Sequence, residues 1–182
     1  MQSYDLIVIG SGPAGQRAAI QGAKAGKRVA LVERREVVGG ACISTGTIPS
    51  KTMREAVLHL SGFHYQSIYG INYKVKEKIS MADLSFRVQH VIKTEVDVTQ
   101  AQLSRNNIEL ITGSASFVSP TQLKVENSRG ISEFESRFFV IATGTKPASS
   151  DRVPLNGHPV TRLLCQNPAS STPIPYDSHF PL

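Results

Sequence analysis

Apolar positions in the first third of the chain fall into two short runs separated by an alanine-rich segment. The run from Tyr4 to Ile9 predicts a strand buried on both faces of a parallel sheet, because nearly all of its positions are apolar. Small residues recur through residues 16–26 and predict a helix that packs closely on a sheet. A second apolar run over residues 27–33 predicts the next strand. The pattern therefore indicates a βαβ unit.

Two further helices are predicted before the middle of the chain ends. Pro49 suits the first turn of a helix over residues 50–60, because the N–H that proline lacks has no partner there. Ser80 and Asp83 have the spacing of a capping box, with Asp in place of Glu. They predict the start of a long helix over residues 81–105, which carries apolar residues at helical spacing.

Beyond the long helix the pattern changes to period two. It predicts short strands at residues 108–111, 114–117, 122–126, 131–134 and 138–142. The fold class expected is α/β: a Rossmann-like domain with a parallel sheet, a long helix and a small antiparallel β insertion. We expect this domain to occupy residues 1–160. Residues 161–182 are rich in proline and serine and are predicted to form an irregular tail.

Composition narrows the function classes. The 182 residues are 40% hydrophobic and 19% charged, which is typical of one globular domain. The net charge is +6, but the basic residues are scattered and no nucleic-acid-binding motif occurs, so no nucleic-acid partner is expected. No apolar run near the start is long enough to span a membrane, so we expect a cytoplasmic protein. Cys42 and Cys165 fit no metal-ligand spacing, and no metal is expected.

A glycine-rich motif, GSGPAG, follows the first strand and opens the first helix. Gly10 suits the tight turn, Gly12 allows the backbone to approach a pyrophosphate, and Gly15 allows the helix to pack on the strand. Pro13 and Ala14 complete the cradle at the helix N-terminus, where free N–H groups and the helix dipole favour phosphate. A strand before the motif and a helix after it predict a dinucleotide site.

Glu33 ends the second strand, 18 residues past Gly15, and Arg34 follows it. A carboxylate at this position accepts hydrogen bonds from an adenosine ribose. It also disfavours a 2′-phosphate, because the two negative charges repel. Glu33 does not separate NAD from FAD, so the identity of the dinucleotide stays open on these residues alone.

Three motifs together resemble the pyridine nucleotide–disulfide oxidoreductase family, which includes glutathione reductase, dihydrolipoamide dehydrogenase and mercuric reductase. They are VIGSGPAG, ERREVVGGACISTGTIPSK and a late ATG, and the resemblance runs from about Tyr4 to Val160. It implies that the glycine cradle holds FAD. It also implies that a loop of the pattern GGxCxxxxCxPSK faces the isoalloxazine ring. Cys42 matches the first cysteine of that loop, and Thr47 replaces the second.

The substitution at Thr47 changes the chemistry that the resemblance implies. A disulfide reductase passes electrons through a pair of sulfurs, whereas hydride exchange between two nicotinamides needs only a flavin. The retained GTIPSK is similar to the transhydrogenase branch of the family. Thr47 and Lys51 share a helical face, and the resemblance places them beside the flavin, where we expect Thr47 to donate a hydrogen bond and Lys51 to stabilise the reduced form. The other cofactor-binding positions that the resemblance implies are Gly39, Gly40, Ala41, Cys42, Ala115, Ala142, Thr143 and Gly144.

Members of this family are much longer, and they carry a second glycine cradle for NAD(P)(H) and a dimerisation domain. No second cradle follows Gly144, so we expect a truncated or frameshifted product, with NAD(P)(H) binding and homo-oligomers belonging to the full-length family. Two functions stay open. One is FAD-dependent hydride transfer between NADPH and NAD+. The other is a non-catalytic FAD-binding module or a remnant of a disulfide reductase-like enzyme, although Thr47 disfavours disulfide reduction.

Overall fold

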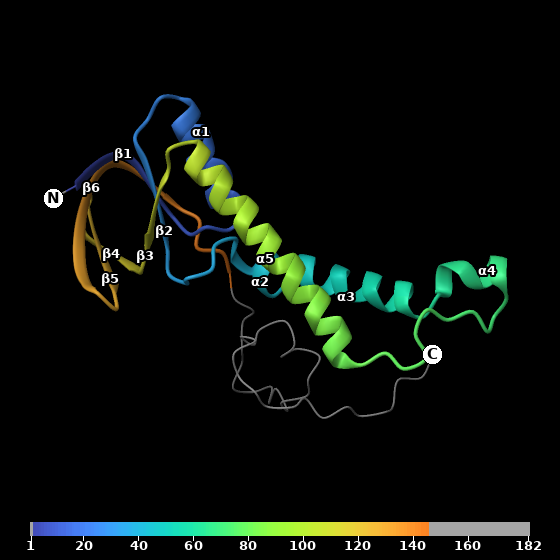
Figure 1. The fold of residues 1–182 in the computed structure, drawn as a ribbon. Coiled ribbons are helices and arrows are strands. Elements are labelled where there is room, and N and C mark those ends of the chain that lie inside the picture. Colours follow the sequence, from blue (N-terminus) through green and yellow to red (C-terminus); the bar gives the residue numbers. More distant parts are fainter. Residues whose placement is uncertain (1, 146–182) are drawn as a thin grey trace, which may run out of the picture. The chain divides into compact units, whose positions relative to one another are not determined.

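The computed structural model describes residues 2–145, which form a six-stranded sheet in the order β3-β2-β1-β6-β5-β4 (Figure 1). The strands are β1 (Gln2–Ile9), β2 (Val29–Glu33), β3 (Glu109–Thr112), β4 (Ser114–Ser119), β5 (Gln122–Asn127) and β6 (Gly130–Ile141). β1 pairs in parallel with β2 and β6, and β3 pairs in parallel with β2. β4, β5 and the start of β6 form an antiparallel meander. The predicted fold class is therefore confirmed.

The helices are α1 (Pro13–Lys24), α2 (Gly40–Ser44), α3 (Thr47–Leu60), the 3-10 helix η1 (Phe63–Tyr65), α4 (Gln66–Tyr69) and α5 (Met81–Arg105). The capping box of α5 is confirmed. The Ser80 hydroxyl accepts a hydrogen bond from the Asp83 N–H, and the Asp83 carboxylate accepts one from the Ser80 N–H. The helix ends before Asn107, which has a positive φ of 54°. α1 begins at Pro13, three residues earlier than predicted.

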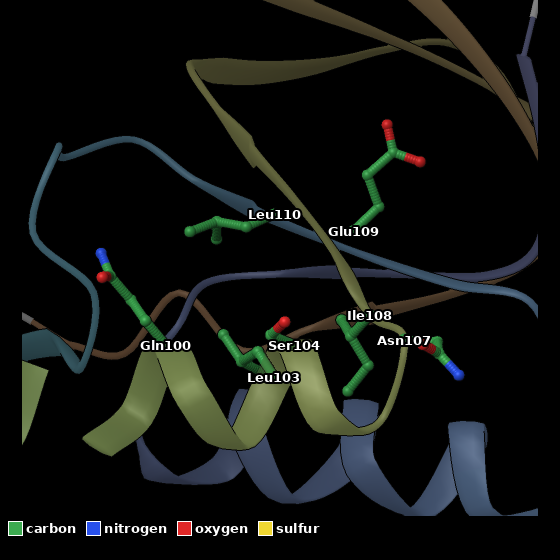
Figure 2. Close-up of a pocket in the computed structure, with 7 residues that line it drawn as sticks. All are labelled: Gln100, Leu103, Ser104, Asn107, Ile108, Glu109 and Leu110. Carbon is green, nitrogen blue, oxygen red and sulfur yellow. The ribbon is translucent and has the colours of Figure 1, made fainter. Parts of the chain in front are cut away.

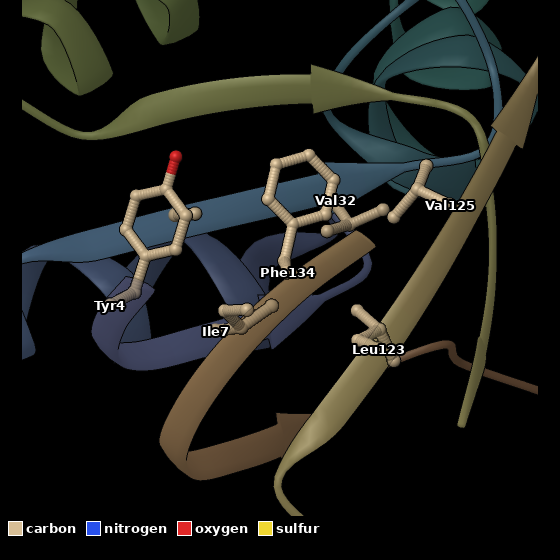
Figure 3. Close-up of a cluster of buried hydrophobic side chains, with 7 residues drawn as sticks. Tyr4, Ile7, Val32, Leu123, Val125 and Phe134 are labelled. Carbon is tan, nitrogen blue, oxygen red and sulfur yellow. The ribbon is translucent and has the colours of Figure 1, made fainter. Parts of the chain in front are cut away.

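The two faces of the sheet are buried in different ways. Ile7 and Tyr4 of β1 lie in a cluster with side chains from β2, β5 and β6, among them Val32, Leu123 and Phe134 (Figure 3). The side chains that bury this face therefore come from strands of the sheet itself. α1 and the end of α5 lie over the opposite face of the sheet (Figure 1), and their side chains form a second buried cluster with side chains of that face. That second cluster contains Val8, Ala19, Ile20, Val29, Leu31, Leu103 and Ile108.

The separate strands expected at residues 131–134 and 138–142 are wrong, because the chain forms one continuous strand, β6. The polar residues between the two apolar runs do not break it. Ser136 is buried, its N–H donates to the Thr121 carbonyl at 2.9 Å, and its hydroxyl donates to the Phe138 carbonyl at 2.9 Å. Satisfied in this way, a serine can remain inside a buried strand.

The predicted domain boundary near residue 160, the predicted tail over residues 161–182 and Cys165 lie outside the described residues. Among the helices in residues 2–145, none has both the length and the apolar character needed to cross a membrane.

Candidate cofactor site

Loops that follow the parallel strands meet at one edge of the sheet. The Gly10 N–H donates to the Val32 carbonyl at 2.8 Å, and the Ala142 N–H donates to the Ile9 carbonyl at 2.8 Å. The Gly113 N–H donates to the Glu33 carbonyl at 2.9 Å. The ends of β1, β2, β3 and β6 are thereby tied together. Open α/β sheets bind ligands at this carboxyl edge of the strands.

Each glycine of the GSGPAG motif has a different steric environment. Gly10 has a φ of +105°, and a Cβ on it would lie 2.4 Å from the Ala142 carbonyl oxygen. A Cβ on Gly15 would lie 1.8 Å from the Gly10 carbonyl oxygen. Around Gly12 no atom lies within 4 Å of the corresponding position. Gly10 and Gly15 are therefore required by the fold, whereas Gly12 borders open space in which a ligand can approach the backbone.

The N-terminus of α1 is suited to an anion. Gly12 is the N-cap residue and provides no side-chain cap, and the first turn contains no acidic residue. Pro13 and Ala14 are exposed at this end of the helix. The first N–H groups of a helix have no intrahelical partner, and the helix dipole makes them partially positive. This end of α1 therefore offers backbone donors to a phosphate group.

Glu33 is half-buried at the end of β2 and is held by hydrogen bonds. Its Oε2 atom accepts from the Ser11 N–H at 2.9 Å and from the Ser11 hydroxyl at 2.6 Å, and its Oε1 atom accepts from the Arg35 N–H at 3.0 Å. Burial raises the pKa of the Glu33 carboxyl. The hydrogen bonds from Ser11 and the Arg35 N–H, with the Arg34 N–H nearby, outweigh that effect, and the pKa lies below its ordinary value. Glu33 is therefore a carboxylate at neutral pH, with the Arg34 side chain exposed beside it.

The loop after β2 runs next to the glycine cradle and into α3. Gly39 and Gly40 both have positive φ, and a Cβ on Gly40 would lie 2.9 Å from the Gly12 Cα atom. Ala41 and Cys42 lie on the short helix α2, where Cys42 is a partly buried free thiol. This helix was not predicted. Its Ile43 side chain is buried and anchors the loop.

Thr47 and Lys51 lie one turn apart at the start of α3, and both are exposed. Within residues 2–145 the Lys51 ammonium makes no hydrogen bond or ion pair. The pair shares one helical face, as the sequence predicts, because residues four apart are neighbours on a helix.

The remaining predicted positions lie after the end of β6 and within β4. Thr143 and Gly144 follow β6 and are exposed, and Ala142 packs beside Gly10 and Gly15. Ala115 is partly buried in β4, two residues after Gly113, whose N–H donates to the Glu33 carbonyl. Ser11 was not predicted as a site residue. The only sequence signal for it is its position inside the GSGPAG motif, between the first two glycines.

A separate pocket of about 440 Å³ lies between the end of α5 and β3 (Figure 2). Glu109 is the only ionisable residue among those that line it. Its carboxylate already accepts hydrogen bonds from the Tyr4 hydroxyl at 2.6 Å and the Gln2 amide at 3.0 Å. None of the cradle residues lines this pocket, so it is not the predicted dinucleotide site.

Sequence comparisons relate the chain to known proteins. A family profile described as pyridine nucleotide-disulphide oxidoreductase matches residues 4–168. The chain is 52% identical over 150 residues to a soluble pyridine nucleotide transhydrogenase of Mycobacterium tuberculosis (strain ATCC 25177 / H37Ra), covering 81% of this chain and 32% of the relative. It is 34% identical over 157 residues to a protein of the same name from Colwellia psychrerythraea, covering 86% of this chain and 33% of the relative.

Solved structures also resemble this chain. A Cu(II) complex of the HOCl-induced flavoprotein disulfide reductase RclA from Escherichia coli has a TM-score of 0.67 and 29% sequence identity, over 83% of this chain and 31% of that chain. The chain therefore spans about a third of the length of the curated relatives and of the solved structure that it matches.

Proposed function

The chain belongs to the pyridine nucleotide-disulphide oxidoreductase family, and we propose that it forms the FAD-binding part of an NAD(P)+ transhydrogenase. The observation that carries this proposal is the loop at the cradle's edge, which keeps Cys42 and the helix start of α3 but has Thr47 in the position of a second cysteine. A disulfide reductase needs two sulfurs within reach of each other. Hydride exchange between nicotinamides does not.

The residues present fit FAD. The open space at Gly12 and the uncapped N-terminus of α1 suit its pyrophosphate, and the Glu33 carboxylate suits the adenosine ribose. We assign the adenine to the backbone of Ala115. The residues assigned to the rest of the cofactor are Gly10, Pro13, Ala14, Gly15, Arg34, Gly39, Gly40, Ala41, Cys42, Thr47, Lys51, Ala142, Thr143 and Gly144.

When bound, FAD supplies a carrier that accepts a hydride from NADPH and returns it to NAD+. The chain's residues control the surroundings of that carrier. The Thr47 hydroxyl would donate a hydrogen bond to the ring, in the position where a disulfide reductase has a reactive cysteine. The Lys51 ammonium would stabilise the negative charge of the reduced ring, because a positive charge near developing negative charge lowers its energy.

The relatives' names call them soluble pyridine nucleotide transhydrogenases, and on that ground we assign this chain to the cytoplasm, with NAD(P)(H) as its substrates. We further propose a homo-oligomer as the active form.

Titration of the 182-residue chain with FAD, followed by quenching of flavin fluorescence, tests the proposal. We expect saturable binding at micromolar FAD, and we expect Gly12→Asp to abolish it because a carboxylate would face the pyrophosphate. When the remaining two thirds of the Mycobacterium tuberculosis relative are fused to this chain, NADPH should bleach the bound flavin under anaerobic conditions, and NAD+ should restore its colour. Oxidised lipoamide and oxidised glutathione should not restore it. Absence of FAD binding, or faster reoxidation by a disulfide than by NAD+, would contradict the proposal.

A further inference from the structure

Ser11 is the point at which three loops of the site are joined. The residue is fully buried, and all its polar atoms are engaged. Its N–H and hydroxyl both donate to Glu33 Oε2, at 2.9 Å and 2.6 Å. The same hydroxyl oxygen accepts from the Gly39 N–H at 2.9 Å, and the Ser11 carbonyl accepts from the Gln16 side-chain amide at 2.8 Å.

The two bonds from Ser11 determine how Glu33 can meet a ligand. A carboxylate oxygen has two lone-pair sites, so both sites of Oε2 are filled by Ser11. Oε1 accepts the Arg35 N–H at 3.0 Å and is the oxygen with capacity for a further donor. Ser11 therefore fixes the rotation of the carboxylate and leaves Oε1 to a ligand hydroxyl.

The bond from Gly39 connects this carboxylate to the next loop. Gly39 precedes α2, and its neighbour Gly40 lies against the Gly12 backbone. The same loop continues to Thr47 at the start of α3. Through its hydroxyl, Ser11 thus holds the end of β2, the cradle and the loop before α3 in one arrangement before any ligand binds.

We propose that Ser11 is the positioning residue for the adenosine half of the cofactor, a role that rests on the FAD binding proposed above. Ser11 acts through Glu33: it presents Oε1 to the vicinal hydroxyls of the ribose. It contacts no reacting atom and is not catalytic. Since buried polar groups that hold one another in place lose less entropy on binding, removal of the hydroxyl should weaken dinucleotide binding in particular.

Ser11→Ala is compared with Ser136→Ala, which deletes an equally buried hydroxyl whose bond to the Phe138 carbonyl lies outside the site. FAD and FMN, which lacks the adenosine half, are each titrated against both variants and the wild-type chain. We expect Ser11→Ala to raise the dissociation constant for FAD at least tenfold and to raise that for FMN by a much smaller factor. Ser136→Ala should change neither by more than twofold.

A double variant at Ser11 and Glu33 shows whether Ser11 positions Glu33 or only stabilises the fold. If Ser11 acts through Glu33, the double variant with Ser11→Ala and Glu33→Gln should bind FAD no more weakly than Glu33→Gln alone. The affinity of Ser11→Ala for FAD should also fall between pH 7 and pH 5 more steeply than that of the wild type, because Glu33 has lost the hydroxyl that keeps it ionised. Should Ser11→Ala fail to fold, Ser11→Cys retains a weak donor of similar size and must show the same dependence on Glu33.

Each result has a defined meaning. Additive losses in the double variant, or equal FAD affinity of Ser11→Ala and Ser136→Ala, would overturn the role of Ser11 while leaving FAD binding intact. A wild-type chain that binds no FAD would overturn the proposed function and this inference with it.

Discussion

Gly12 and Gly15 provide a test that separates the fold from the ligand site. A methyl group at Gly12 meets no atom within 4 Å, and the backbone φ of −64° is allowed for any L-residue. A methyl group at Gly15 would lie 1.8 Å from the Gly10 carbonyl oxygen, so the turn or the helix must move. Gly12→Ala should therefore fold and bind poorly, whereas Gly15→Ala should fold poorly.

The expected magnitudes follow from these environments. Alanine is a poorer N-cap than glycine, so Gly12→Ala should cost at most about 1 kcal/mol of stability, or about 2–4 °C in Tm. If its methyl group displaces one backbone hydrogen bond to the charged pyrophosphate, about 1.5–3 kcal/mol of binding is lost, which is about 10- to 150-fold in Kd. Overpacking at Gly15 should cost about 3 kcal/mol, or about 6–12 °C in Tm.

Two measurements on the purified chain are sufficient: thermal unfolding by circular dichroism without FAD, and FAD titration below the melting range. Wild-type FAD affinity in Gly12→Ala would refute the assignment of the pyrophosphate to this cradle. Wild-type stability in Gly15→Ala would refute the close packing of α1 on the end of β1.

Three further predictions concern single side chains. Because the folded-state pKa of Glu33 is lowered, its contribution to the free energy of unfolding is present above its ordinary pKa and lost as pH falls through the lower folded value. The stability gap between wild type and Glu33→Gln in urea should thus narrow on acidification, and a constant gap would contradict this. Ser80→Ala should lower the Tm by about 2–4 °C through loss of about 1 kcal/mol of capping, while Ser104→Ala in the last turn of the same helix should not. Lys51→Met should bind oxidised FAD with the wild-type affinity but bind reduced FAD about 10- to 100-fold more weakly, with Lys51→Arg retaining most of the affinity, as followed by titration with dithionite-reduced FAD under anaerobic conditions.

Local signals account for the parts of the fold that could be predicted. The long helix α5 is marked by a complete capping box at Ser80 and by apolar residues at helical spacing. β1 and β2 are marked by runs in which most positions are apolar. α2 has no such signal, since it is five residues long and begins with Gly40. It is held in place by the Gly39 N–H, which donates to the hydroxyl of the remote Ser11, and by the buried Ile43 side chain.

The residues of the candidate site also fall into those that a local motif predicts and those that depend on contacts between remote residues. The glycines of the cradle and Glu33 could be predicted, because a motif fixes their spacing to a strand and a helix. Ser11 could not, because its importance depends on Glu33 and Gly39 converging on one hydroxyl, 22 and 28 residues away in the sequence. Thr47 and Lys51 were assigned from resemblance, and their role stays a prediction.

The continuous strand β6 has a consequence for how the chain folds during synthesis. β1 is completed at Ile9, but its second parallel partner ends at Ile141. At about 5–20 residues per second on the ribosome, roughly 7–26 s separate the emergence of the two strands. During that interval α1 and β2 can already pack on β1, while the other edge of β1 remains without its neighbour. Closure of the sheet is thus a late event of high contact order, and until then the open edge of β1 can pair with other strands.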